Sequence, residues 1–158
     1  MGSGWARGAA LAVAAAIAAA APAPAQQVRE LGFGGIATAS DPALAVAAGW
    51  VALRPSLRTR VSLAAGLGAS DGRTAARGEV LAHFLLSPAR RSGAGLYAAG
   101  GVAGVVGPVD EGYLVLVLGV EGRPGGPSGW FVEGGVGGGA RFAAGWRWRR
   151  FPPGWPGR

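Results

Sequence analysis

The sequence of 158 residues contains no cysteine and no lysine, and it has a single histidine. Without cysteine the chain has no disulfide framework, no thiolate metal site and no cysteine-linked lipid anchor. Charged residues make up only 15% of the chain, and all 15 basic residues are arginine. Beyond the first 25 residues, no stretch reaches the roughly 18 consecutive apolar residues of a membrane-spanning helix. A disulfide-stapled domain and a helical membrane protein are therefore not expected.

The first 25 residues have the composition of a secretory signal peptide. Arg7 lies in a short leading region, residues 9–21 form the apolar stretch AALAVAAAIAAAA, and A-P-A at 23–25 offers a cleavage site. We therefore expect Sec-type export, with cleavage between Ala25 and Gln26. An uncleaved N-terminal anchor is the alternative, and the two prolines near the cleavage site disfavour it.

The remaining chain has the pattern of a β protein. Of the 31 glycines in the full sequence, 28 lie in this part and are spread through every apolar segment, and an interior glycine costs a helix about 1 kcal/mol. Turn signals rich in proline, glycine and aspartate separate apolar runs of about eleven residues, which is longer than the strands of a typical soluble sandwich. The runs are 28–40, 43–53, 56–69, 73–87, 93–106, 112–122, 129–138 and 140–151. We expect eight strands in one domain, residues 26–151, followed by a short tail, residues 152–158.

Within these runs, apolar residues alternate with small or charged ones. In RGEVLAHFLL the arginine, glutamate and histidine share one face, and in YLVLVLGVEG three leucines occupy the face opposite the glutamate. The charges of the intervening turns also alternate. The first, third and fifth turns contain Asp41, Asp71, Asp110 and Glu111, whereas the second, fourth and sixth contain Arg54, Arg90, Arg91 and Arg123. In an up-and-down path, odd-numbered and even-numbered turns lie at opposite ends of the barrel. The acidic turns would then lie at one end and the arginine-containing turns at the other, and an even number of strands brings both termini to the arginine-containing end.

A tilted strand needs about 9–11 residues to cross a bilayer, and the predicted strands have this length. Closure into a barrel removes the sheet edges that long apolar strands would otherwise expose. The predicted fold class is therefore all-β, a closed antiparallel up-and-down transmembrane β-barrel of about eight strands. Its apolar faces would point outward to lipid and its small and charged faces inward.

In its strand pattern the chain resembles the small eight-stranded outer-membrane barrels of Gram-negative bacteria, the OmpA-type membrane domain and its OmpX-like relatives. The resemblance implies an outer-membrane location, periplasmic termini, aromatic girdles and a closed polar interior. It also implies that the barrel-assembly machinery reads a terminal strand ending in an aromatic residue. Here RFAAGWRWRRF ends in Phe151, although PPGWPGR follows, and the long outer loops of many relatives are missing.

Inward-facing charges are expected to form a structural network that plugs the barrel, since unpaired charges there would be costly. Its predicted members are Arg58, Arg60, Arg77, Glu79, His83, Glu121, Glu133, Arg141, Arg147 and Arg149, with Tyr97 on the same side and Glu133 and Arg141 as cross-strand partners. An ion or proton path along these residues is the alternative. The predicted aromatic girdle comprises Trp50, Phe142, Trp146 and Trp148.

Few residues point to chemistry. A lipid hydrolase on a barrel would need His83 and a serine on the lipid-facing surface, whereas the pattern places His83 inward, with Ser62 as the same-face candidate. One histidine, no cysteine and no clustered aspartates predict no metal site and no cofactor. Residues 141–151 put arginine and tryptophan on opposite faces, which argues against nucleic-acid binding.

The sequence thus predicts a small outer-membrane β-barrel, not an enzyme, with a structural or surface-interaction role. Its expected partners are outer-membrane lipid and the barrel-assembly machinery, and its oligomeric state is open. Two alternatives remain: a secreted soluble barrel of the lipocalin type that binds a small apolar ligand, and a membrane-embedded lipid hydrolase.

Overall fold

A computed structural model of the protein describes residues 27–108 and 110–156. The predicted signal peptide and its cleavage site at Ala25 and Gln26 lie outside the described residues. The structure has eight strands: β1 (Val28–Ala39), β2 (Leu44–Arg54), β3 (Thr59–Ser70), β4 (Arg73–Leu85), β5 (Ala94–Val106), β6 (Glu111–Gly122), β7 (Ser128–Val136) and β8 (Ala140–Arg150). In the part of the chain that the structure describes, no helix is long and apolar enough to span a membrane.

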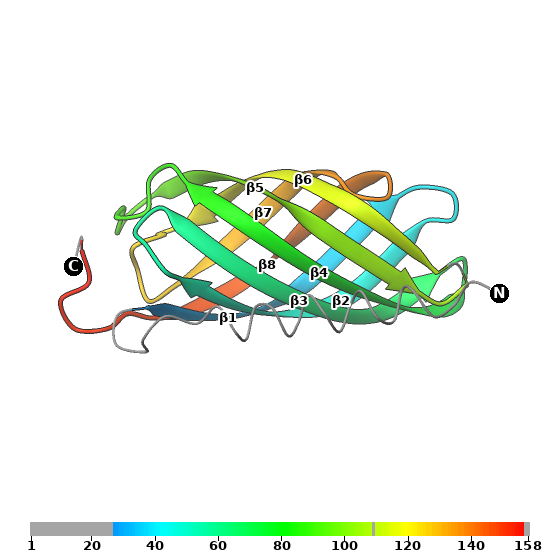
Figure 1. The fold of residues 1–158 in the computed structure, drawn as a ribbon, viewed down its shortest axis with the longest axis horizontal. Coiled ribbons are helices and arrows are strands. Elements are labelled where there is room, and N and C mark those ends of the chain that lie inside the picture. The colour runs from blue at the N-terminus through cyan, green and yellow to red at the C-terminus, as the bar shows by residue number, and fades with distance from the viewer. Residues whose placement is uncertain (1–26, 109, 157–158) are drawn as a thin grey trace.

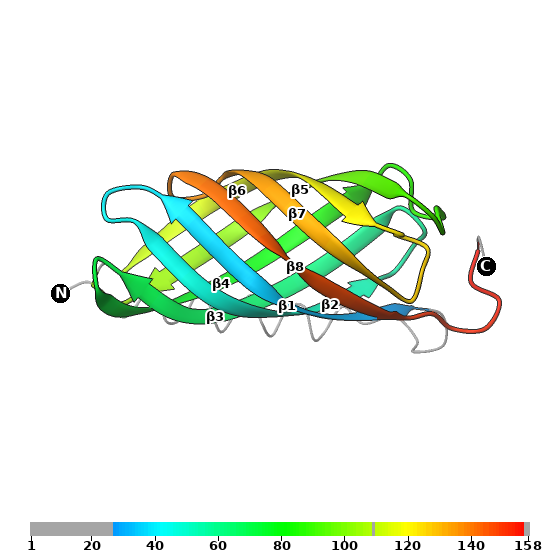
Figure 2. The same ribbon diagram turned by 180° about the vertical axis from the view of Figure 1, so that it is seen from behind.

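The strands form one closed barrel in which each strand pairs antiparallel with its sequence neighbours. The strands tilt across the barrel axis, and β8 lies beside β1 to close the sheet (Figures 1 and 2). At this seam the register runs from Arg29 opposite Arg150 to Ala39 opposite Ala140, so both strands are paired along nearly their full length. The predicted eight-stranded, closed, up-and-down barrel is confirmed.

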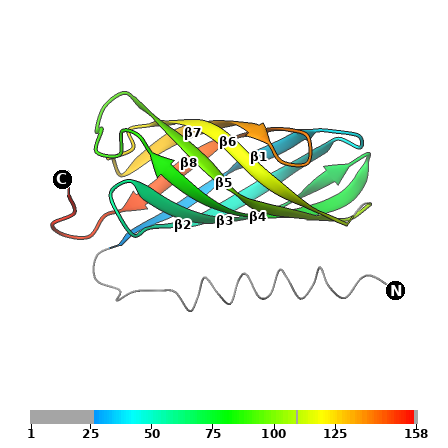
Figure 3. The same cartoon turned by 45° about the horizontal axis from the view of Figure 1, so that its top comes forward.

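Because the path is up and down, the turns fall at two ends. We call the end with the β1–β2, β3–β4, β5–β6 and β7–β8 turns the odd-turn end, and the opposite end, where β1 begins and β8 stops, the even-turn end (Figure 3). The tight turn between β3 and β4 places Asp71 and Gly72 at φ of 49° and 71°. This left-handed pair matches the twist of a two-residue hairpin and explains the Asp-Gly sequence there.

Strand alternation divides the side chains between the outer surface and the interior. Leu114, Leu116 and Leu118 point outward and are 80%, 64% and 72% exposed, whereas Val115 and Val117 between them are buried. The protein therefore exposes large apolar side chains around its circumference and buries charged ones, which is the reverse of a soluble protein.

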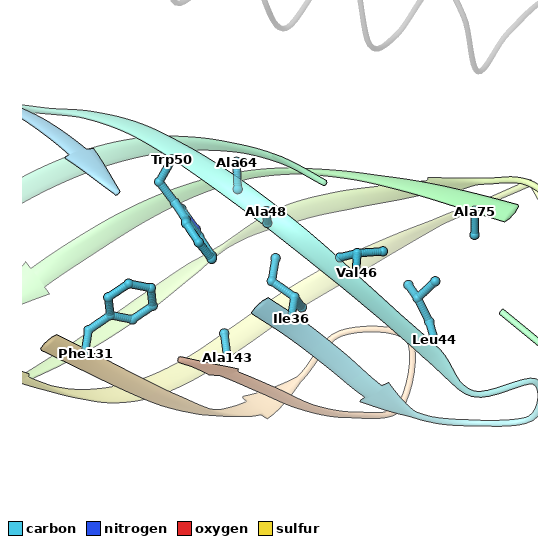
Figure 4. Close-up of a cluster of buried hydrophobic side chains, with 9 residues drawn as sticks. All are labelled: Ile36, Leu44, Val46, Ala48, Trp50, Ala64, Ala75, Phe131 and Ala143. Atoms are coloured by element: carbon cyan, nitrogen blue, oxygen red, sulfur yellow. The ribbon is translucent and has the colours of Figure 1, made fainter. Parts of the chain in front are cut away.

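Part of the interior is apolar. The Trp50 and Phe131 rings meet edge to face with their centroids 5.2 Å apart, and Ile36 and Val46 continue the cluster along the barrel (Figure 4). Space for the Phe131 ring comes from a glycine on the inward face of β8, since a Cβ at Gly145 would lie 2.9 Å from this ring. Small residues thus let an eight-stranded barrel hold two aromatic side chains.

Candidate functional site

The inward faces of seven strands bring ten charged side chains into the barrel. We call this set the lumen ion-pair network: Glu30, Arg54, Arg60, Arg77, Glu79, Glu121, Glu133, Arg141, Arg147 and Arg149. Every member is at most 5% exposed. Burial of this many charges is tolerable only if they are paired and hydrogen-bonded.

Glu121 is the centre of the network near the even-turn end. Its Oε1 accepts a hydrogen bond from Arg60 Nη2 at 2.6 Å, and its Oε2 accepts one from Arg149 Nη2 at 2.7 Å. On the neighbouring strands β1 and β2, Glu30 accepts a hydrogen bond from Arg54 Nε. The network here joins residues from β1, β2, β3, β6 and β8, so it connects strands that do not pair with one another.

Two arginines of β8 carry the network along the barrel. Arg147 donates to Glu121 at 3.2 Å and to Glu133 at 2.9 Å, and so connects two carboxylates. Arg141 donates to the other oxygen of Glu133 at 3.0 Å. The Tyr97 hydroxyl also donates to Glu133, at 2.7 Å, so this carboxylate accepts three hydrogen bonds.

Glu79 closes the network toward the odd-turn end. Arg141 binds it with two hydrogen bonds, from Nε at 2.9 Å and from Nη2 at 2.7 Å, the two-pronged geometry that favours an arginine–carboxylate pair. Arg77 Nε donates to the same carboxylate at 2.7 Å, and its other nitrogens donate to Thr38 Oγ1 and to the Gly137 carbonyl. The ion pairs therefore form a continuous series from Arg54 near the even-turn end to Arg77 near the odd-turn end.

Within residues 27–108 and 110–156, six buried polar atoms have no hydrogen-bond partner: Glu30 Oε2, Arg54 Nη2, Arg60 Nε and Nη1, Arg149 Nε and His83 Nδ1. Most surround Glu30. Three of them still face a carboxylate at ion-pair distance, with Arg54 Nη2 3.5 Å from Glu121 and both Arg60 Nε at 3.5 Å and Arg149 Nε at 3.7 Å from Glu30. Electrostatic attraction rather than direct hydrogen bonding thus holds part of the even-turn half.

A hollow of about 280 Å³ opens at the odd-turn end. It is lined by residues at the strand ends and in the turns. Arg77, a member of the lumen ion-pair network, is one of these lining residues. Its other lining residues include Thr38, Asp41, Leu44, Glu111 and Tyr113.

Nine of the ten predicted network residues lie inside the barrel. The exception is Arg58, which is exposed in the turn before β3. The prediction began this strand at residue 56, whereas the hydroxyl of Ser56 accepts a hydrogen bond from the Thr59 backbone N–H and holds this segment as a turn. The prediction missed Glu30 and Arg54. Arg54 was assigned to a turn, although it has the same parity as the inward residues of β2.

The predicted aromatic girdle is wrong at Trp50, which points inward and is 5% exposed. Both faces of the predicted run 43–53 are apolar, because this run stops before Arg54, so alternation within it does not tell which face is inward. Phe142, Trp146 and Trp148 lie on the outer surface as predicted, and Trp130, which was not included, pairs with Trp146 across β7 and β8.

His83 lies inside the barrel, where its Nε2 is 2.8 Å from Ser62 Oγ. A hydrolase acting on membrane lipid would need this pair on the outer surface, and neither side chain reaches it. Among the described residues no group of three histidine or acidic side chains could hold a metal ion.

The exposed charges are divided between the two ends. Exposed acids lie at the odd-turn end: Asp41, Asp71, Asp110 and Glu111. Exposed arginines lie at the even-turn end, Arg73 excepted: Arg29, Arg58, Arg90, Arg91, Arg123 and Arg150. Of the charged residues within the strands, only Arg29 and Arg150 have outward parity.

The chain continues past β8 without further strand structure up to residue 156. The Phe151 ring lies 6.0 Å from the Arg54 guanidinium, and Trp155 is buried beside a hollow shared with the β2–β3 turn. The tail therefore folds over the even-turn end.

Comparison with solved structures identifies the architecture. The fold is similar to the N-terminal β-barrel domain of Pseudomonas aeruginosa OprF, with a TM-score of 0.60, 13% sequence identity and coverage of 80% of this chain and 98% of that chain. The chain has an OprF-type barrel fold. No protein-family model matches the sequence, and no curated protein matches it either. The OprF-type barrel is thus recognised from its strand order and closure, at an identity that shows the fold alone.

Proposed function

We propose that this protein is a small outer-membrane β-barrel with a structural role, whose interior is plugged by the lumen ion-pair network. The periplasmic side of the membrane would face the even-turn end, which carries both ends of the barrel domain. The single observation that carries the proposal is the distribution of polarity, with leucines exposed outside and paired arginines and glutamates buried inside.

This distribution argues against a soluble barrel that binds an apolar ligand. Such a protein needs a water-compatible exterior and an apolar cavity. Here the outer surface of β6 presents three leucines to the surroundings, and Arg60, Arg141 and Arg147 fill the space where a ligand would lie.

The packing of the interior supports a plug rather than a pore. The side chains of Arg54, Arg60 and Arg141 are completely buried, and the rings of Tyr97 and Phe131 fill the space between the ion pairs. Arg147 lies with its guanidinium carbon 3.9 Å from the centre of the Phe131 ring. An ion would have to break several of these contacts to pass, so we expect no conductance.

The proposal is tested by adding one charge to the outer surface. Leu116 lies near the middle of β6 and faces outward, so Leu116→Arg should destabilise a membrane barrel by about 2–4 kcal/mol. The matched control is Ala89→Arg, which adds the same charge to an exposed turn. The full-length protein is expressed in a Gram-negative host, recovered from outer-membrane fractions and unfolded in detergent or lipid, with boiled and unboiled samples compared by gel mobility.

A soluble barrel would tolerate Leu116→Arg within about 0.5 kcal/mol, as is usual for exposed positions in water, and it would fractionate without detergent. Either result refutes the membrane location. Conductance of the wild-type protein in planar bilayers would refute the plug while leaving the location intact.

A further inference from the structure

We infer that Arg29 and Arg150 form a binding site for the phosphate of an anionic phospholipid at the even-turn end of the barrel. The inference rests on the proposed membrane location and adds a ligand to it. The two residues are directly opposite each other in the β1–β8 seam. Both are exposed and both have outward parity, so their guanidinium groups share one patch of the outer surface.

Two like charges directly opposite each other on neighbouring strands repel and destabilise the pair. The described residues offer no relief, since no exposed acid lies at the even-turn end and neither arginine takes part in an ion pair. An anion bound between the two guanidinium groups would remove the repulsion. Phosphate oxygens suit this task because guanidinium binds them with paired hydrogen bonds.

The surroundings of the pair indicate that the phosphate belongs to a lipid. Leu31 and Trp148 pair with each other one row above, on the same outward face, and Leu53 lies opposite Arg29 on β2. One such row is two residues, or roughly 7 Å, along a strand. Tryptophan is favoured at the boundary between hydrocarbon and headgroups. The arginines therefore lie where the headgroup of a lipid would be when its acyl chains contact Leu31 and Trp148.

The other exposed arginines at the even-turn end attract anionic lipid over a longer distance, without direct contact with a headgroup. Arg58, Arg90, Arg91 and Arg123 lie in the turns, beyond the ends of the strands. Because these side chains are not on the outer face of the barrel wall, they are not positioned to contact a lipid headgroup together with its acyl chains. They provide the matched control for a test of the site.

The experiment measures lipid preference next to the barrel surface. The protein is folded into vesicles of phosphatidylcholine mixed with phosphatidylglycerol, and either lipid carries brominated acyl chains that quench the outward tryptophans Trp130, Trp146 and Trp148. The variants are Arg29→Gln with Arg150→Gln, and the control Arg91→Gln with Arg123→Gln, which removes the same charge from the same end.

Since one arginine near an anionic membrane surface changes affinity by a factor of roughly five, we expect the wild type to prefer phosphatidylglycerol at least about five-fold. The Arg29/Arg150 variant should lose this preference, and the control should keep most of it. Equal preference for both lipids in the wild type, or an equal loss in both variants, would overturn the site.

Inorganic phosphate, with ionic strength matched by chloride, separates the lipid from the free anion. If phosphate alone abolishes the preference, the site takes free phosphate and the lipid assignment is wrong. Failure of the protein to fold in vesicles of phosphatidylcholine alone would instead contradict the proposed membrane location, so the two failures are distinguishable.

Discussion

Replacing Glu121 with glutamine should destabilise the barrel strongly. The carboxylate accepts hydrogen bonds from Arg60 at 2.6 Å, Arg149 at 2.7 Å and Arg147 at 3.2 Å, and it lies 3.5 Å from Arg54. Glutamine keeps the size of the side chain but removes the charge and replaces an acceptor by a donor. Removal of one partner from a buried ion pair costs about 3–5 kcal/mol, because the other charge stays buried without compensation.

The assay is urea unfolding of the purified protein in lipid vesicles, followed by tryptophan fluorescence and by the gel mobility of unheated samples. Asp71→Asn is the matched control, because it makes the same change of carboxylate to amide in an exposed turn where Asn-Gly is as favourable as Asp-Gly. The control should unfold with the wild type, and Glu121→Gln should unfold at a clearly lower urea concentration.

A double variant tests the reasoning itself. If Glu121 and Arg60 stabilise each other, Glu121→Gln combined with Arg60→Met should cost less than the sum of the two single changes, by about 0.5–3 kcal/mol. Strict additivity, or a Glu121→Gln variant as stable as the wild type, would refute the claim that this carboxylate compensates the arginines around it.

Two further comparisons use the same unfolding assay. Trp50→Ala should cost about 3–5 kcal/mol because it empties a packed interior site, whereas Trp148→Ala, on the outer surface, should cost clearly less; equal losses would contradict the inward position of the Trp50 ring. Gly119→Ala should cost about 1–3 kcal/mol because its Cβ would overlap the buried Tyr97 ring, and Gly134→Ala, where a Cβ meets no atom within 4 Å, should be neutral.

The fold could be predicted from the sequence because several independent features agree. Run length and the alternation of side chains indicate long strands with two different faces, and the charge of the turns indicates an up-and-down path with an even number of them. Alternation put Arg77, Glu79 and Glu133 on the faces opposite the large apolar residues, and the choice of a membrane barrel, which turns apolar faces outward, then placed them in the interior.

The errors lie where alternation carries no information. In the predicted run 43–53 both faces are apolar, and the inward position of Trp50 is marked only by its packing on Phe131 of β7 and by Arg54, which shares its face but lies beyond the predicted run. Arg58 lies beyond the end of its strand because of a local Ser56 hydrogen bond, and Glu30 became a network member through a diagonal contact with Arg54 on the neighbouring strand β2. Such contacts depend on three-dimensional register, which a single sequence does not show.

The order of the ion pairs along the chain has a consequence for how the barrel enters a membrane. The first six strands contribute three arginines and three glutamates to the interior, whereas β7 and β8 contribute one glutamate and three arginines. In a chain inserted without its last hairpin, Glu79 would keep only Arg77 as a partner and Glu121 would lose both Arg147 and Arg149, in a medium that penalises charges with few partners. Partly inserted forms are therefore high in free energy, and insertion should be cooperative, with the C-terminal hairpin present before the barrel wall closes around its charges.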